Sequence, residues 1–260
     1  MVTLPTPRRF EYVKRSIAAF CDQTHRNKEL IIVVDPEPVS ARASLAEYVG
    51  ALGRSDIRIV VAPQKLKLGE LRNMSVDCAQ GDVLCQWDDD DLYHPQRLEC
   101  QLAPLLKGEY EAVYLRDVMQ YFPAERTLYW TNWQVTEAGG HPGTLMVKRS
   151  TPIRYPVEGA VASLGEDLRV ALHLKQRGHL CFLPGMPHLF LYVSHGANSW
   201  DSGHHRMLSS ELAISQGLLK RRESEIRNGL ASFDLGEGPI AVRGNNGLAF
   251  TIQPSLLSPR

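Results

Sequence analysis

The first hundred residues alternate between short apolar runs and segments with helical spacing. Four apolar runs have the length of buried strands, and they cover residues 1–4, 29–35, 57–62 and 82–87. Segments with apolar side chains every three or four positions lie between them, at 12–21, 44–52 and 69–79. This alternation predicts an α/β fold in which a mostly parallel sheet is flanked by helices.

The pattern changes after a helix predicted over residues 95–106. Further strands are expected at 111–115, 144–147, 180–183 and 189–193, and a helix at 168–176. Residues 119–134 are rich in aromatic side chains, among them Tyr129, Trp130 and Trp133, which suit either core packing or stacking on a sugar ring. The pattern then predicts one long helix over 207–228 and a hairpin formed by 239–242 and 248–252.

Candidate binding residues follow three of the predicted strands. Pro5 and Thr6 follow the first, Asp35 follows the second, and residues 88–91 follow the fourth. In open α/β sheets, ligands bind outside the carboxyl ends of the strands. We therefore expect these three loops to converge on one binding crevice.

The run Asp88–Asp91 places four carboxylates side by side, and they repel one another unless a cation is near. Hard divalent cations such as Mg²⁺ and Mn²⁺ bind carboxylate oxygens and keep positions open for phosphate. In an extended strand Asp88 and Asp90 share one face, which suits a single ion. The alternative from the residues alone is a solvated acidic turn before a helix.

Composition narrows the function classes. The chain has 260 residues, 43% of them hydrophobic, and a formal net charge of zero, which argues against a nucleic-acid-binding surface. The five cysteines include no CxxC pair, so neither a disulfide framework nor a zinc ribbon is indicated. No apolar run reaches the length of a membrane span and no signal peptide is evident, so a cytoplasmic location is expected.

Residues 68–99 resemble the core of the family 2 glycosyltransferases, which are inverting enzymes with a GT-A fold. The resemblance rests on Gly69, Arg72-Asn73, the small residues before the fourth strand, the Asp-x-Asp-Asp pattern at 88–91, and His94-Pro95. Pro5-Thr6, the second strand with Asp35, and Glu166-Asp167 also resemble family segments. The resemblance covers about residues 1–200.

The resemblance implies a GT-A domain over 1–205, with a nucleotide-sugar half at 1–100 and an acceptor half at 101–205. Residues 206–260 would form a C-terminal helix and tail. Two departures stand out: Asp35 is followed by Pro36-Glu37 instead of Gly-Ser, and the Gln-x-x-Arg-Trp motif of processive synthases is absent. The second departure suggests transfer of a single sugar.

The resemblance also implies a donor site for a nucleotide-diphosphate sugar, with UDP as the default nucleotide. Asp35 would accept a hydrogen bond from the base, although an Asp at a strand end can also cap a turn. Arg72 would reach a phosphate or pair with a nearby acid. The other implied donor-site residues are Pro5, Thr6, Gly69, Asn73, Asp88 and Asp89. The implied ligands of Mn²⁺ or Mg²⁺ are Asp88, Asp90 and His195, the last of which suits a solvent-exposed loop equally well.

Asp167 is the candidate catalytic base, and Glu166 the candidate that orients the acceptor. Inverting transfer requires a carboxylate that takes the proton of the acceptor hydroxyl as its oxygen attacks the anomeric carbon. From the residues alone, an N-terminal helix cap is an equally good interpretation of this Glu-Asp pair. The acceptor would be a saccharide, a lipid-linked molecule or another small molecule, and His141 is a candidate for its site or a simple turn residue.

The amphipathic helix predicted from Met207 has a basic end, which suits either peripheral contact with anionic lipid or packing on its own domain. Two other functions fit parts of the pattern. A sugar-phosphate nucleotidyltransferase would share the fold and the metal, but Thr6 to Arg9 lacks the glycines of its usual loop. A non-catalytic GT-A-like binding domain would be expected to lose the acids, which are present here. The identities of the sugar and acceptor and the oligomeric state have no signature in the sequence.

Overall fold

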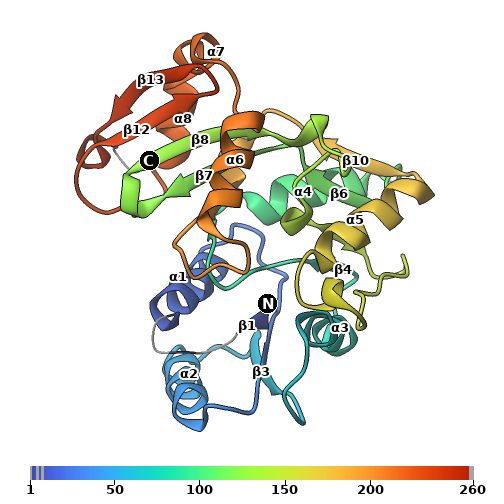
Figure 1. Ribbon diagram of the computed structural model, residues 1–260. Helices are drawn as coiled ribbons and strands as arrows, with labels where there is room; N and C mark the ends of the chain where they lie inside the picture. Colours follow the sequence, from blue (N-terminus) through green and yellow to red (C-terminus); the bar gives the residue numbers. More distant parts are fainter. Residues whose placement is uncertain (1, 4–5, 7–8, 258–260) are drawn as a thin grey trace. The chain divides into compact units, whose positions relative to one another are not determined.

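The computed structural model describes residues 2–3, 6 and 9–257. Contacts divide the chain into two compact units, which are described separately below (Figure 1). The first unit consists of residues 1–90, 98–114 and 142–181, and the second of residues 91–97, 115–141 and 182–260. This division follows contacts rather than function, so the boundaries predicted at residues 100 and 205 stay predictions.

The first unit contains a three-stranded parallel sheet in the order β1-β2-β3. Figure 1 shows α1 and α2 on one side of this sheet and α3 on the other. The strands are β1 (Val2–Thr3), β2 (Leu30–Val34) and β3 (Ile57–Val61), and the helices are α1 (Phe10–Cys21), α2 (Val39–Ala51) and α3 (Leu68–Cys78). All six elements were predicted from the sequence, although α2 begins earlier than the predicted residue 44.

The continuous apolar run of β2 follows from its position in the middle of this sheet. All five residues of β2 are buried, and Ile31 and Val33 pack with Leu71 of α3. A strand that is covered on both faces has no solvent side, so its sequence shows no alternation of polar and apolar residues.

A four-stranded sheet follows, in the order β10-β6-β9-β4. Strand β9 is antiparallel to both β4 and β6, so the parallel arrangement of the first sheet does not continue here. The strands are β4 (Val83–Cys85), β6 (Ala112–Leu115), β9 (Met146–Lys148) and β10 (Leu180–Leu183). The helices that accompany them in the sequence are α4 (Arg97–Leu106) and α5 (Glu166–Arg177).

The second unit is built on a six-stranded mixed sheet in the order β13-β12-β8-β7-β11-β5. The aromatic-rich stretch forms the antiparallel pair β7 and β8 at its centre. The predicted C-terminal hairpin is confirmed as β12 and β13, and β12 pairs in parallel with β8, so the hairpin extends the sheet. The strands are β5 (Leu92–Tyr93), β7 (Asp117–Phe122), β8 (Thr127–Asn132), β11 (Phe190–Val193), β12 (Ile240–Gly244) and β13 (Gly247–Ile252).

The prediction of one long helix over residues 207–228 is wrong. Three helices occupy this region: α6 (Ser202–Leu212), α7 (Gln216–Arg221) and α8 (Glu223–Leu230). The helix stops at Ala213, which bridges to Thr131, and the N–H of Ile214 donates to the Trp130 carbonyl at 3.0 Å. Ser215 then caps α7 by accepting from the N–H of Leu218. The expectation of membrane contact therefore loses the continuous amphipathic helix on which it was based.

The outer edge of β13 carries side chains from α7 and α8. The Arg227 guanidinium donates to the Thr251 carbonyl at 2.9 Å, and the Gln216 amide donates to the Leu248 carbonyl. Short 3₁₀ turns complete the described chain at η1 (Pro123–Glu125), η2 (Trp133–Val135), η3 (Pro142–Thr144), η4 (Ala160–Ala162), η5 (Pro187–Leu189) and η6 (Pro254–Leu256). None of the helices in the described part of the chain has the length and apolar character needed to cross a membrane.

Candidate functional site

The acidic run follows β4 in the first unit, and α1 fixes its backbone. The Ser16 hydroxyl donates to the Asp88 carbonyl at 2.8 Å, and the Trp87 indole N–H donates to the Ser16 carbonyl at 3.2 Å. Before the run, the N–H of Gln86 donates to the Leu145 carbonyl at 2.8 Å. The carboxylates therefore start from a backbone that is held on both sides.

Asp88 accepts hydrogen bonds on both carboxylate oxygens. Arg72 Nη1 donates to Oδ1 at 2.8 Å, and Gln86 Nε2 donates to Oδ2 at 3.1 Å. Burial opposes ionisation of this carboxyl, but the charge of Arg72 and the two hydrogen bonds outweigh it and lower the pKa of Asp88. Asp88 is therefore a fixed anion at neutral pH.

Arg72 joins this anion to the start of α5. Its Nε donates to Glu166 Oε1 at 2.8 Å, and both side chains are buried. Of the two roles open to Arg72 from the sequence, pairing with an acid is the one observed, and it occurs twice. One guanidinium thus holds two carboxylates that are far apart in the sequence, at the end of β4 and at the start of α5.

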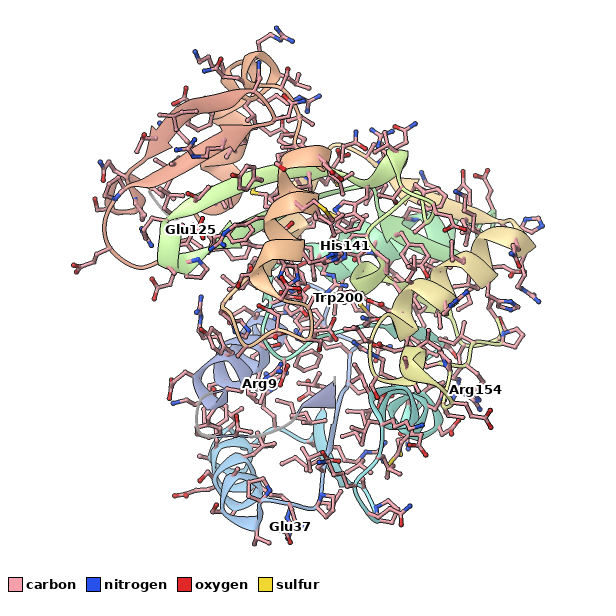
Figure 2. The ribbon with its side chains drawn as sticks, in the orientation of Figure 1. Arg9, Glu37, Glu125, His141, Arg154 and Trp200 are labelled. Atoms are coloured by element: carbon pink, nitrogen blue, oxygen red, sulfur yellow. The ribbon has the colours of Figure 1, made fainter. Side chains whose placement is uncertain are left out.

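Asp89 and Asp90 share a second arginine. Arg9, labelled in Figure 2 near the start of α1, directs Nη2 toward Asp89 Oδ1 and toward Asp90 Oδ2, the latter at 2.9 Å. Asp89 is buried and Asp90 is partly exposed. Arg9 therefore supplies positive charge of the kind that the sequence led us to expect near this acidic run.

The oxygen donors of the run also suit a divalent metal. Within residues 2–3, 6 and 9–257, no three His, Cys, Asp or Glu side chains form a group that could hold a metal ion. The carboxylates of Asp88 and Asp90 are nevertheless hard oxygen ligands, and the Arg9 guanidinium already occupies a cation position at Asp90. Donor chemistry therefore fits Mn²⁺ or Mg²⁺ at Asp90, in competition with Arg9.

Asp91, the last of the four acids, belongs to the second unit and has a structural role. It is 2% exposed, and its Oδ1 accepts from the N–H of Val193 in β11 at 2.9 Å. His195 follows β11 in the same unit. Its N–H donates to Asn198 Oδ1 at 2.9 Å, and the Asn198 amide donates to the Val193 carbonyl, so the loop is closed on itself. Metal ligation by His195 stays a prediction.

Glu166 and Asp167 occupy the first turn of α5. The N-cap is Gly165, which has φ of 82°, so Asp167 is not the cap that the sequence left open. The Asp167 Oδ1 accepts the neighbouring N–H of Leu168 at 2.8 Å, and the side chain stays partly exposed. Burial in the protein, followed by the charge of Glu166, raises the pKa of Asp167 to about 6, against the opposing charge of Arg72.

Gly69 and Asn73 have a different explanation from the one the resemblance implied. A Cβ at Gly69 would lie 1.9 Å from the Pro156 carbonyl oxygen, so only glycine allows this close approach. Asn73 donates to the Tyr155 carbonyl at 2.9 Å and accepts from the Tyr155 N–H at 2.8 Å. Both residues hold the segment that leads to Glu166, and their donor-binding role stays a prediction.

Asp35 follows β2 with a carboxylate that lacks a partner on one side. The residue is 7% exposed, and its buried Oδ1 has no hydrogen-bond partner among the described residues. A buried acceptor without a donor is costly unless a ligand supplies one. Thr6 is exposed and its carbonyl accepts from the Arg9 N–H at 3.0 Å, while Pro5 lies outside the described residues.

The aromatic residues of the second unit mostly pack in its core. Trp130 is 3% exposed, and its indole N–H donates to Asp117 Oδ1 at 3.1 Å. His141, labelled in Figure 2, is buried, with its ring centroid 4.5 Å from that of Trp133 and 5.2 Å from that of Phe190. Core packing therefore accounts for Trp130 and His141 without a ligand, while Trp133 and Tyr129 are partly exposed.

Comparison with known proteins identifies the family of the chain. The sequence profile of "Glycosyl transferase family 2" matches residues 1–159. The chain belongs to this family. The match includes β1 to β4, α1 to α3 and the acidic run, and it ends just before α5.

Two curated relatives are named as glycosyltransferases of amylovoran and of colanic acid biosynthesis. The amylovoran biosynthesis glycosyltransferase AmsB of Erwinia amylovora is 30% identical over 104 residues, which is 39% of this chain and 34% of AmsB. The putative colanic acid biosynthesis glycosyl transferase WcaA of Escherichia coli K12 is 34% identical over 104 residues, which is 39% of this chain and 36% of WcaA. The matched segment thus spans about a third of each relative.

Solved structures of similar proteins establish the fold of this chain. S. aureus TarS (residues 1–349) superimposes with a TM-score of 0.55 and 14% identity, covering 88% of this chain and 73% of TarS. The mannosyltransferase PcManGT from Pyrobaculum calidifontis, in complex with GDP-Man and Mn²⁺, gives 0.55 and 13% identity, covering 87% of this chain and 63% of PcManGT. The predicted GT-A fold is confirmed.

Three polar residues of the site were not identified from the sequence. Arg9, Gln86 and Tyr155 contact the acidic run directly or through one another. The one available signal was Gln86, a polar side chain inside an apolar run that was predicted to be a strand. Arg9 lies 80 positions from Asp89 in the sequence, and Tyr155 lies 69 positions from Gln86, so no local pattern reveals either contact.

Proposed function

We propose that this family member is an inverting glycosyltransferase that moves a single sugar from a nucleotide-diphosphate sugar to an acceptor hydroxyl. The observation that carries the proposal is the ion-pair chain Asp88–Arg72–Glu166, next to which Asp167 stays partly exposed with its pKa raised to about 6. A general base works best when its pKa lies close to the working pH. A carboxyl with an ordinary pKa would be a weaker base.

Asp167 would accept the proton of the acceptor hydroxyl as that oxygen bonds to the anomeric carbon. The bond from the anomeric carbon to the diphosphate oxygen breaks at the same time, and the nucleoside diphosphate leaves with its electron pair. Glu166, held by Arg72, would keep the first turn of α5 in position. A divalent metal, when bound at Asp90 with Asp88, would neutralise charge that builds on the leaving diphosphate.

A UDP-sugar is the proposed donor because UDP is the nucleotide that the family resemblance implies, and Asp35 is compatible with uracil as well as with thymine and guanine. Its unpartnered Oδ1 is a hydrogen-bond acceptor that requires an N–H donor. Uracil carries one at N3, as do thymine at N3 and guanine at N1, whereas cytosine has an unprotonated acceptor nitrogen at position 3. S. aureus TarS has been solved with UDP-GlcNAc, and PcManGT with GDP-Man, so the family neighbours include both kinds of donor.

The decisive variant is Asp167→Asn. It should abolish transfer and leave UDP and metal binding nearly intact, because the amide keeps the shape of the side chain but cannot take a proton. Transfer is measured as release of UDP from a UDP-sugar, and binding by calorimetry. The exposed acid Glu158 provides the control, since Glu158→Gln should leave both unchanged. Equal loss of binding and transfer in Asp167→Asn would contradict the assignment of the base.

A thermal-shift panel of UDP-, GDP- and dTDP-sugars, each with and without Mn²⁺, identifies the donor class. A ligand that binds the native state raises the melting temperature by mass action. Asp90→Asn should remove the metal-dependent part of the shift, and an undiminished Mn²⁺ effect would refute the metal assignment. Release of pyrophosphate in place of a nucleoside diphosphate would indicate a nucleotidyltransferase instead.

A further inference from the structure

Gln86 is a buried amide directly before the acidic run. It is 8% exposed, and its backbone N–H is fixed by the Leu145 carbonyl. Its side chain makes two bonds of opposite kind: Nε2 donates to Asp88 Oδ2, and Oε1 accepts from the Tyr155 hydroxyl, each at 3.1 Å. The amide therefore connects Tyr155 to the carboxylate of Asp88.

Both the backbone and the ring of Tyr155 are held by neighbouring residues. Its N–H and carbonyl are both bonded to the Asn73 side chain, and the next residue, Pro156, packs against Gly69. The Arg72 guanidinium lies 5.6 Å from the centroid of its ring. Burial raises the pKa of Tyr155, so the hydroxyl keeps its proton and can donate.

The direction of the chain follows from the chemistry of its ends. An ionised carboxylate only accepts, so the Gln86 amide must turn its NH₂ toward Asp88. Its oxygen then faces Tyr155, whose hydroxyl must donate. The tyrosine proton reinforces this orientation of the amide, because a flip would place the amide oxygen against the Asp88 carboxylate and the NH₂ against the Tyr155 hydroxyl proton.

We infer that Tyr155 and Gln86 are positioning residues that orient the Asp88 carboxylate for the nucleotide-sugar donor. The inference rests on the proposed function, because the orientation matters only if Asp88 serves the donor. Arg72 holds one oxygen of Asp88 and the amide holds the other, so the carboxylate plane is fixed. Outer hydrogen-bond partners of this kind influence affinity through the group that they orient.

The test removes one oxygen atom. Tyr155→Phe should raise the donor KM for slow hydrolysis of the UDP-sugar, and the calorimetric dissociation constant of UDP with Mn²⁺, by about tenfold. The kcat at saturating donor should change far less, since Asp167 is untouched. Tyr48→Phe is the control: this hydroxyl of the same unit contacts the Lys14 carbonyl, and its loss should leave the donor KM unchanged. An unchanged donor KM in Tyr155→Phe would overturn the inference.

A double-variant cycle identifies the path. If the effect of Tyr155 passes through Gln86, then Gln86→Met and the double variant should show the same loss of UDP affinity as Tyr155→Phe alone. Losses that multiply would overturn the relay.

A second cycle needs no donor. Thermal unfolding of Tyr155→Phe, Asp88→Asn and their combination should give non-additive changes in stability, and additive changes would overturn the link between the two residues. If wild-type protein binds none of the nucleotides, the proposed function fails, while this cycle still decides whether the relay exists.

Discussion

The two units of the molecule bury polar groups in different ways. In the first unit the buried groups are full charges in pairs: Arg72 with Asp88 and Glu166, and Arg9 with the next two acids. In the second unit the buried polar groups include imidazoles among aromatic rings. The ring centroids of His94 and His188 are 5.0 Å apart, and the His205 ring is hydrogen-bonded to the hydroxyls of Tyr192 and Ser194.

The difference follows from what each group can do when it leaves water. Arginine cannot lose its proton, so it enters a protein interior only with acids beside it. Histidine can become neutral near pH 7, and burial lowers the pKa of both His94 and His188. The first unit should therefore respond to the deletion of a charge and the second to acid.

The largest expected effect is from Arg72→Met. It leaves Asp88 and Glu166 buried without their cation, which should cost about 3–5 kcal/mol in the free energy of unfolding measured with urea. Arg154→Met is the control (Figure 2), because Arg154 and its partner Asp77 are 63% and 59% exposed and should contribute less than about 1 kcal/mol. Equal losses in the free energy of unfolding in the two variants would contradict the claim that the first unit depends on buried charge pairs.

Acid should destabilise the second unit through His94. Burial, followed by the charge of His188, lowers the pKa of His94 to about 4. The folded state therefore favours the neutral ring, so this stability is present above pH 6.5 and is lost as the pH falls toward 4, to a limit of roughly 3 kcal/mol. His94→Gln should flatten the pH dependence of unfolding in this window. The same substitution at His173, which is exposed on α5, should not change it.

Gly69→Ala tests packing rather than charge. The added methyl meets the Pro156 carbonyl, and over-packing of this kind should cost about 1–3 kcal/mol, visible as a lower melting temperature. Gly50 of α2 has open space around it, so Gly50→Ala should instead stabilise the protein by up to about 1 kcal/mol. A stabilising effect at both positions would show that the segment at Pro156 can yield.

The smallest expected effect is the contribution of Asp167, which forms no ion pair with an arginine among the described residues, to the pH dependence of stability. Because the pKa of Asp167 is raised to about 6, the folded state holds this proton more tightly than the unfolded chain does. Stability therefore falls as the pH rises from about 4 to 6, and Asp167→Asn should be more stable than wild type above that range, by less than the effect at His94 because the Asp167 side chain is partly exposed and screened by water. A loss of stability at pH 7 would indicate that Asp167 is held by a structural bond.

The first unit could be predicted well from the sequence because its strands and helices follow local patterns of apolar residues. Strands such as β2 are buried on both faces, and the helices between them have a clear apolar side, so both are visible within a window of a few residues. The acidic run and the Glu-Asp pair were also visible, since each is local.

The second unit was harder to predict because its elements are decided by partners far away in sequence. The break between α6 and α7 depends on a bridge from Ala213 to Thr131, and nothing near Ala213 requires it. The same limit applies in the first unit to Gln86 and Tyr155, whose roles depend on a contact between side chains 69 positions apart in the sequence. Tertiary contacts override local preference at such places.

The C-terminal hairpin has a consequence for the behaviour of the protein at high concentration. An outermost strand normally offers a row of free backbone groups to which another chain can add, and this is a common start of aggregation. At β13 two of these carbonyls already accept bonds from Gln216 and Arg227. These side chains of α7 and α8 thereby oppose the addition of another strand to β13, and replacing both with alanine should increase aggregation of the protein at high concentration.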